Sequence, residues 1–240
     1  MRKGIYILPN TLTLGGLFCG FYAILAAFKG DYVHSAWAIL IANIFDGLDG
    51  WVARLTNTTT KFGIELDSLS DLVAFGVAPS VLLYSWALNP FGRLGWGATF
   101  FFVLCGALRL ARYNVQKETA ESKAFTGLPI PAAGSSIAVL VLFSYEIWGG
   151  IGERNYFVLC LPFLIALLMV STVKFHSFKE VDFKNRKPFW LLVAIVVIFV
   201  LIFMYPEVVL FSVTFIYILL GLIEGTYFLN KKRKAKKEVA

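Results

Sequence analysis

This chain of 240 residues consists mainly of long apolar stretches that are separated by short polar linkers. A membrane-spanning α-helix needs about 20 mostly apolar residues, and eight stretches approach that length. The linkers contain glycine and proline, which interrupt helices. The pattern therefore predicts an all-α, polytopic membrane helix bundle of about eight transmembrane helices. The predicted spans are 11–28, 33–55, 67–88, 96–114, 130–148, 155–174, 188–204 and 207–229.

The composition supports a membrane protein and excludes an ordinary soluble domain. Hydrophobic residues make up 58% of the chain and charged residues only 15%, whereas soluble domains carry about 25% charged residues. No hydrophilic segment is long enough to fold separately. We therefore expect residues 1–240 to form a single transmembrane domain.

The basic residues are distributed unevenly between the two sides of the predicted bundle. With eight spans both termini lie on one side, which receives all but three of the 22 Lys and Arg residues; the exceptions are Lys29, Arg93 and Arg154. Basic loops stay in the cytoplasm, so we expect a multi-pass protein of the cell membrane with cytoplasmic termini and a basic cytoplasmic tail at 230–240. Anionic lipid headgroups account for the net charge of +7, and no nucleic-acid partner is expected.

Four aspartates lie where the second and third spans approach each other. Asp46 and Asp49 are three residues apart, and Asp67 and Asp71 are four apart; on helices both spacings place the side chains on one face. All four carboxylates can converge near the cytoplasmic membrane surface, where they must take up protons or be neutralised by cations. Oxygen ligands suit Mg²⁺ or Mn²⁺, and two such ions about 3.5–4 Å apart are common in phosphoryl chemistry.

Small and phosphate-binding residues accompany these aspartates. Gly50, Ala53 and Gly63 allow another group to approach the backbone closely. Arg54 lies one turn beyond Gly50 and carries a guanidinium group suited to phosphate, and Thr60 adds a hydroxyl in the loop. Together with two cations, these residues predict a pyrophosphate site that faces the cytoplasm at the lipid interface.

The four aspartates, with the glycines, the alanine and the arginine between them, resemble the signature of the CDP-alcohol phosphatidyltransferase family and match every fixed position of it. Other segments are similar to its bacterial and archaeal phosphatidylserine synthases: LPNTLTLGGLFCGF at 8–21, ALRLARYNV at 107–115 and FTGLPIPAAG at 125–134. The resemblance covers about 5–175 and is weak across 188–229. The matching signature is Asp46-x₂-Asp49-Gly50-x₂-Ala53-Arg54-x₈-Gly63-x₃-Asp67-x₃-Asp71.

The resemblance implies a six-helix core over about 5–175, two additional C-terminal helices and a homodimer. It also implies an enzyme that displaces CMP from CDP-diacylglycerol, or from an archaeal ether-lipid analogue, with an alcohol. By the same resemblance Asp71 is the general base. The residues implied to hold two divalent cations, Mg²⁺ or Mn²⁺, are Asp46, Asp49, Asp67 and Asp71, and those implied to bind CDP-diacylglycerol are Asn10, Gly50, Arg54, Thr60 and Gly63.

Basic residues near the end of the fourth span are candidates for binding the acceptor alcohol. Arg109 and Arg112 are one helical turn apart, and Lys123 follows in the linker. Such groups suit the carboxylate of serine, or equally the phosphate of glycerol 3-phosphate or inositol phosphate, and they also serve as membrane anchors. The chemistry leaves these alternatives open, whereas the resemblance favours L-serine.

A transporter of divalent cations, or one coupled to protons, is the alternative from a different functional class. Transporter sites tend to lie near the bilayer midplane, between internal repeats. Here the predicted carboxylate cluster lies at one membrane edge, and its motif occurs once in the sequence. The pattern therefore favours the enzyme.

Overall fold

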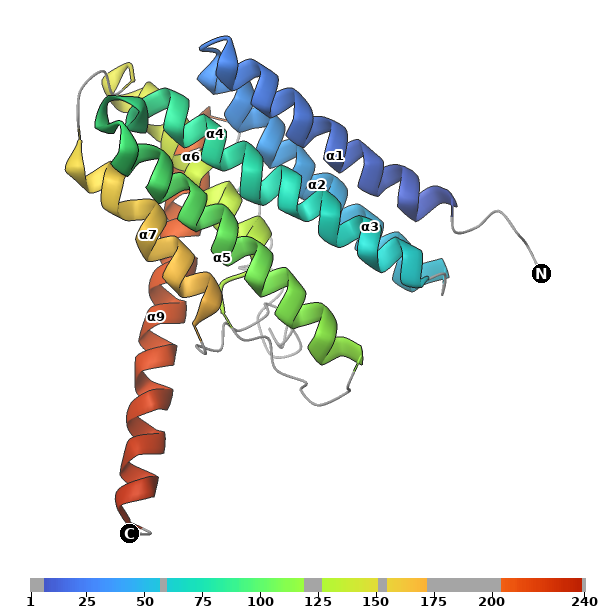
Figure 1. Cartoon of the computed structure of the whole chain (residues 1–240), viewed down its shortest axis with the longest axis vertical. Coiled ribbons are helices and arrows are strands. Elements are labelled where there is room, and N and C mark those ends of the chain that lie inside the picture. Colours follow the sequence, from blue (N-terminus) through green and yellow to red (C-terminus); the bar gives the residue numbers. More distant parts are fainter. Residues whose placement is uncertain (1–6, 57–59, 119–126, 151–154, 172–203, 239–240) are drawn as a thin grey trace, which may run out of the picture.

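Helices make up the regular structure of the computed structural model, which describes residues 7–56, 60–118, 127–150, 155–171 and 204–238. Helices α1 to α7 gather in one bundle, while the far end of α9 extends beyond it (Figure 1). The helices are α1 (Ile7–Phe28), α2 (Tyr32–Thr56), α3 (Lys61–Asp71), α4 (Ala78–Leu83), α5 (Arg93–Glu118), α6 (Ile130–Trp148), α7 (Tyr156–Val170) and α9 (Pro206–Glu238), with short π or 3₁₀ segments η1 (Leu72–Val77), η2 (Tyr84–Leu88) and η3 (Asn89–Phe91).

Six helical stretches of the described chain are long and apolar enough to cross a membrane. The prediction of an all-α, multi-pass membrane protein is therefore confirmed. Helix α7, with 15 residues, is shorter than these six. Residues 188–203 of the seventh predicted span lie outside the described residues, so the number of eight spans and the side of each terminus stay predictions. The six stretches are Leu8–Phe28, Tyr32–Thr56, Lys61–Phe91, Arg93–Gln116, Ile130–Trp148 and Pro206–Ile223.

The third span begins six residues earlier than the sequence pattern predicts. Its first helix, α3, starts at Lys61 because Thr60 caps it: the Gly63 N–H donates a hydrogen bond of 3.0 Å to Thr60 Oγ1. Threonine at this position satisfies one of the backbone N–H groups that a helix leaves unpaired at its start. The cap therefore makes 61–66, which the hydrophobic pattern leaves outside the span, part of the helix.

Two prolines change the hydrogen bonding within the third span. A proline inside a helix lacks the N–H group that would bond to the carbonyl four residues earlier. Just before Pro79 the Ala78 N–H bonds to the Val73 carbonyl, and just before Pro90 the Asn89 N–H bonds to the Tyr84 carbonyl, each five residues back. The span therefore stays helical but widens into the π segments η1 and η2. Segment η1 begins directly after Asp71 of α3.

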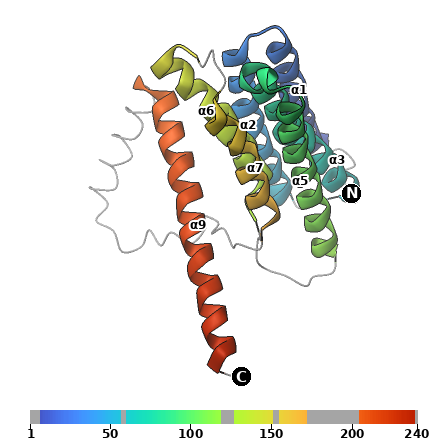
Figure 2. The same ribbon diagram turned by 60° about the vertical axis from the view of Figure 1, so that its left-hand side comes forward.

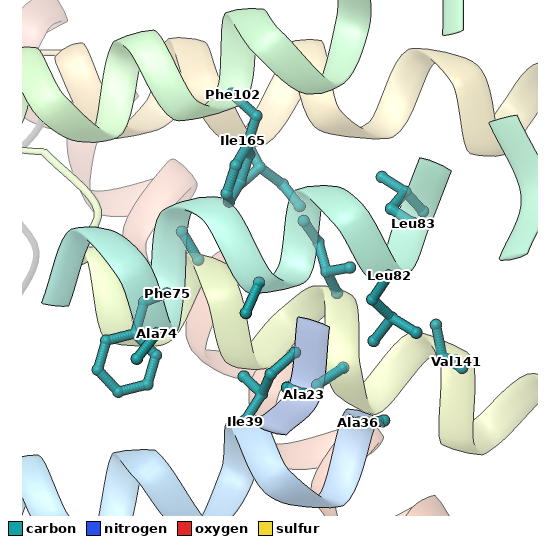
Figure 3. Packing of buried hydrophobic residues seen from close by; sticks show 14 of the residues in the cluster. Ala23, Ala36, Ile39, Ala74, Phe75, Leu82, Leu83, Phe102, Val141 and Ile165 are labelled. Atoms are coloured by element: carbon teal, nitrogen blue, oxygen red, sulfur yellow. The ribbon is translucent and has the colours of Figure 1, made fainter. Parts of the chain in front are cut away.

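Small side chains allow the helices of the core to pack closely. Figure 3 shows alanine, leucine, isoleucine and phenylalanine side chains from several helices meeting around the third span. At Gly134 of α6 an added Cβ would lie 2.7 Å from the Phe75 carbonyl oxygen. Such close approach between membrane helices depends on small residues at the interface. It brings α6 directly against the residues that follow Asp71.

Polar side chains also join neighbouring helices. Ser35 Oγ of α2 donates a hydrogen bond of 2.8 Å to the Ala23 carbonyl of α1. Asn43 Nδ2, also of α2, donates one of 2.7 Å to Ser135 Oγ of α6. Hydrogen bonds of this kind across membrane helices contribute about 0.6 to 2 kcal/mol each. They fix how α2, which carries Asp46 and Asp49, is rotated relative to its neighbours.

Helix α9 packs on the outside of the bundle. It lies along α6 (Figure 2), where the rings of Phe143 and Phe211 stack with their centroids 4.1 Å apart. Many of its other large apolar side chains, such as Ile216 and Ile223, are exposed, as expected for a helix that faces lipid. The division of the chain into a core at 5–175 and additional helices at 188–229 stays a prediction.

Candidate active site

A cavity of about 430 Å³ opens between the start of α1, the end of α2, helix α3 and the second half of α5. Its walls bring together residues that are far apart in the sequence. Eleven of the residues singled out in the sequence line it: Asn10, Asp46, Asp49, Gly50, Ala53, Arg54, Thr60, Gly63, Asp67, Asp71 and Arg109.

The aspartates of α2 and α3 converge in this cavity. Asp46, Asp49 and Asp67 each place one carboxylate oxygen within 4.8 Å of the other two. Asp71 lines the same cavity and interacts electrostatically with Asp46 and Asp67. The convergence predicted from the helical spacing of the two pairs is therefore present in the structure.

This donor set fits divalent cations. Carboxylates held so close repel one another strongly, so protons or cations must compensate their charge. An all-oxygen set of carboxylates, without sulfur or imidazole, is typical of sites for Mg²⁺, Mn²⁺ or Ca²⁺. The cluster combines Asp46 and Asp49 on α2 with Asp67 on α3, so the packing of two helices sets its shape.

A buried hydroxyl from α1 contacts the cluster. Thr13 Oγ1 lies 2.6 Å from Asp49 Oδ2, and Ser70 Oγ of α3 donates a hydrogen bond of 3.0 Å to the Thr13 carbonyl. Thr13, Asp49 and Ser70 are all buried. Thr13 is not among the site residues predicted from the sequence. The available signal was its spacing, because Thr13 lies three residues after Asn10 and so shares a face of α1 with it.

The phosphate-binding candidates lie on the rim of the cavity. The exposed Arg54 side chain runs back along α2, so that a Cβ added at Gly50 would lie 3.5 Å from Arg54 Nη1. A Cβ added at Gly63 would lie 3.1 Å from Thr60 Oγ1 and 3.2 Å from Asn10 Oδ1. These glycines therefore leave room for the neighbouring polar groups. The N-terminus of α3 also faces the cavity here, and helix N-termini favour anions.

The candidates for acceptor binding are separated by the fold. Arg109 is only 8% exposed and lines the cavity, and its Nε has no hydrogen-bond partner among the described residues. Arg112 instead donates a hydrogen bond of 3.2 Å from Nη1 to the Val170 carbonyl at the end of α7, and it does not line the cavity. Lys123 lies outside the described residues.

Two further polar residues, Ser68 and Asn114, line the cavity. Asn114 Nδ2 of α5 donates a hydrogen bond of 2.9 Å to Ser68 Oγ of α3. This hydrogen bond links α3, which carries Asp67 and Asp71, to α5, which carries Arg109. Pro129 and Pro131, at the start of α6, also line the cavity.

Comparison with known proteins identifies the class of this site. Residues 6–166 match the family model described as CDP-alcohol phosphatidyltransferase. The chain belongs to the CDP-alcohol phosphatidyltransferase family. The matched region runs from the start of α1 into α7 and so includes every element that lines the cavity, whereas α9 lies outside it. Membership of the CDP-alcohol phosphatidyltransferases favours the enzyme over the transporter alternative.

Several curated relatives in this family have related names. The chain is 37% identical to the CDP-diacylglycerol–serine O-phosphatidyltransferase of Helicobacter pylori strain ATCC 700392 / 26695, over 95% of this chain and 94% of the relative. It is 36% identical to the protein of the same name from Bacillus subtilis, over 72% and 92%. It is also 37% identical to the archaetidylserine synthase of Methanothermobacter thermautotrophicus, over 70% and 69%.

Proposed function

We propose that this protein transfers the phosphatidyl group of CDP-diacylglycerol to the hydroxyl group of L-serine and releases CMP. The observation that carries the proposal is the cavity, whose lining brings the carboxylate cluster together with Arg54 and the buried Arg109. The names of relatives that match over most of the chain support serine as the acceptor. An ether-linked donor, as the name archaetidylserine synthase indicates for one relative, suits the same site.

The carboxylates hold two divalent cations, Mg²⁺ or Mn²⁺, in this proposal. The ligands are Asp46, Asp49, Asp67 and Asp71, which line one cavity and supply only oxygen atoms. Bound there, the cations supply positive charge that compensates the pyrophosphate of the donor. Asn10, Gly50, Arg54, Thr60 and Gly63 bind the cytidine diphosphate group along the rim.

Asp71 acts as the general base. It takes the proton from the serine hydroxyl, whose oxygen then attacks the phosphorus that carries diacylglycerol. The bond between this phosphorus and the bridging pyrophosphate oxygen breaks, and CMP leaves with that oxygen. Base assistance of this kind contributes about 10²- to 10⁴-fold to a rate. Asp71 lines the cavity and interacts electrostatically with the other three aspartates and with Arg109, which supports this role.

Arg109 binds the carboxylate of serine. A buried guanidinium group whose Nε has no partner in the described part of the chain has a hydrogen-bond donor to offer a ligand. A planar carboxylate accepts two parallel bonds from such a group. Arg112 and Lys123 stay sequence predictions for the same role. The Nη1 of Arg112 is already bonded to the Val170 carbonyl, which makes Arg109 the stronger candidate.

The proposed setting is the cell membrane, with the cavity open to the cytoplasm and the chain assembled as a homodimer. The distribution of Lys and Arg along the sequence supports the cytoplasmic orientation. The cavity is bordered by Arg54 and lies at the end of α2, on the side of the bundle that the basic residues assign to the cytoplasm.

Release of CMP from CDP-diacylglycerol by the purified full-length protein tests the proposal. L-serine, glycerol 3-phosphate and inositol phosphate are supplied in turn with Mn²⁺ or Mg²⁺, and a sample treated with a chelator is the control. We expect release with serine and loss of release on chelation. Release with glycerol 3-phosphate but not with serine would refute the acceptor alone. No release with any acceptor would refute the enzyme class.

A further inference from the structure

A buried hydroxyl of α1 makes a short contact with one carboxylate of the cluster. Thr13 Oγ1 lies 2.6 Å from Asp49 Oδ2 and 3.1 Å from the Pro9 carbonyl oxygen. The hydroxyl has one proton, which serves one acceptor at a time. A distance of about 2.5–2.7 Å is typical of a hydroxyl that donates to a charged carboxylate, so the proton points to Asp49. Thr13 is 5% exposed and Asp49 is 6% exposed, so water has little access to this bond.

The surrounding structure holds Thr13 in place from two directions. Ser70 Oγ, near the end of α3, donates a hydrogen bond of 3.0 Å to the Thr13 carbonyl. Two turns further along α1, Gly20 lies directly against the third span, because a Cβ added there would lie 2.7 Å from Ala74 Cα. Any larger residue at Gly20 would push α1 outward and withdraw Thr13 from Asp49.

This arrangement leaves Asp49 with little rotational freedom. One of its carboxylate oxygens accepts from Thr13, which orients the carboxylate group within the cluster. Partners behind a ligand orient it and raise its basicity, and their loss typically lowers metal affinity about 10- to 100-fold. We propose that Thr13 is a positioning residue, which holds Asp49 in the orientation that binds a divalent cation and so ties α1 to the carboxylate cluster of α2 and α3. The inference rests on the proposed function only in that these carboxylates bind cations.

Binding of Mn²⁺ to the full-length protein in detergent tests the proposal without reference to activity. Free Mn²⁺ is measured by electron paramagnetic resonance as it is added to the wild type, Thr13→Val and Thr13→Ser. Valine keeps the shape of threonine without the hydroxyl, and serine keeps the hydroxyl without the methyl group. Thr11→Val is the matched control, because Thr11 lies on the same helix with its side chain exposed. If the valine variant is not monodisperse, Thr13→Ala replaces it.

We expect Thr13→Val to weaken Mn²⁺ binding by about tenfold or more, and both Thr13→Ser and Thr11→Val to stay within about threefold of the wild type. In an Asp49→Asn background, Thr13→Val should add no further loss, because a residue that acts through Asp49 has no effect once that carboxylate is gone. The KM for Mn²⁺ in CMP release should rise in Thr13→Val, while kcat at saturating Mn²⁺ changes less.

Three outcomes with the variants would overturn the inference. Wild-type affinity in Thr13→Val excludes a role for the hydroxyl. An equal loss in Thr13→Ser assigns the effect to packing of the methyl group. An additive loss in the Asp49→Asn background shows that Thr13 acts elsewhere. A wild type that binds Mn²⁺ but does not release CMP contradicts the proposed function and leaves this inference standing, whereas a wild type that binds no Mn²⁺ contradicts both.

Discussion

At the scale of single residues, Asp71 lies where the helical geometry of the third span changes. It ends α3, and the wider turns of η1 begin at the next residue. Wide helical turns of this type occur frequently at functional sites. The change in geometry follows from Pro79, which lies two turns downstream and cannot donate a backbone hydrogen bond. Pro79 therefore affects the backbone geometry that begins directly after Asp71.

The variant Asp71→Asn should lose turnover and stay folded. The amide has nearly the same shape as the carboxylate but cannot accept the serine proton, so we expect kcat for CMP release to fall by about 100-fold or more. Glu65→Gln is the matched control, since it removes one acidic charge from an exposed position of the same helix. Size-exclusion profiles and kcat are measured for both. Wild-type turnover in Asp71→Asn would exclude Asp71 as the base.

At the scale of the elements, the close contact between α6 and the third span is the feature most sensitive to substitution. Gly134 lies against the backbone of Phe75. A Cβ added at Gly134 would lie 2.7 Å from the Phe75 carbonyl oxygen and 2.8 Å from Phe75 Cα. Phe75 is only 1% exposed, so neither side of the contact can move into free space. Interiors packed this tightly respond to a single added methyl group.

The variant Gly134→Ala should be less stable than the wild type. We expect the free energy of unfolding to fall by about 1–3 kcal/mol, because the added methyl group would overlap backbone atoms. Gly97→Ala is the control: it also lies in the first turns of a long helix, but nothing lies within 4 Å of its added Cβ. There alanine should be neutral or stabilising by up to about 1 kcal/mol. Thermal denaturation in detergent distinguishes the two, and equal stability of the two variants would contradict the packing.

At the scale of the whole molecule, orientation in the membrane decides which compartment reaches the cavity. The structure has a belt of exposed apolar side chains on α1, α5 and α9, and the sequence assigns nearly all basic residues to one side. The linker between α1 and α2 is predicted to lie on the opposite side from the C-terminus. A cysteine in this linker and a cysteine near the C-terminus can be labelled separately.

Labelling of single cysteines tests this orientation. After replacement of Cys19, Cys105 and Cys160, Asp31→Cys and Val239→Cys are introduced separately, and a maleimide that does not cross membranes is added. In right-side-out vesicles we expect labelling at position 31 but not at 239, and in inverted vesicles the reverse. Labelling of both positions from the same side would contradict an even number of spans.

The membrane class, most of the spans and the aspartate cluster can be predicted from the sequence alone. These features depend on local spacing: apolar runs of membrane-spanning length predict helices, and residues three or four apart share a helical face. Asp46, Asp49, Asp67 and Asp71 are therefore recognisable without a structure. Hydropathy places the start of α3 too late, because the cap at Thr60 is a polar signal that it does not register.

Which polar groups from distant segments meet depends instead on how the helices pack. Arg109 and Arg112 are equivalent in sequence, yet their different directions around α5 place one in the cavity and the other on the Val170 carbonyl. The bond between Thr13 and Asp49 likewise depends on how closely α1 approaches α2 and α3. Such contacts are set by helix rotation and by small residues such as Gly20 at the interfaces. Neither is encoded in the spacing within one helix, and both emerge only when the helices pack together.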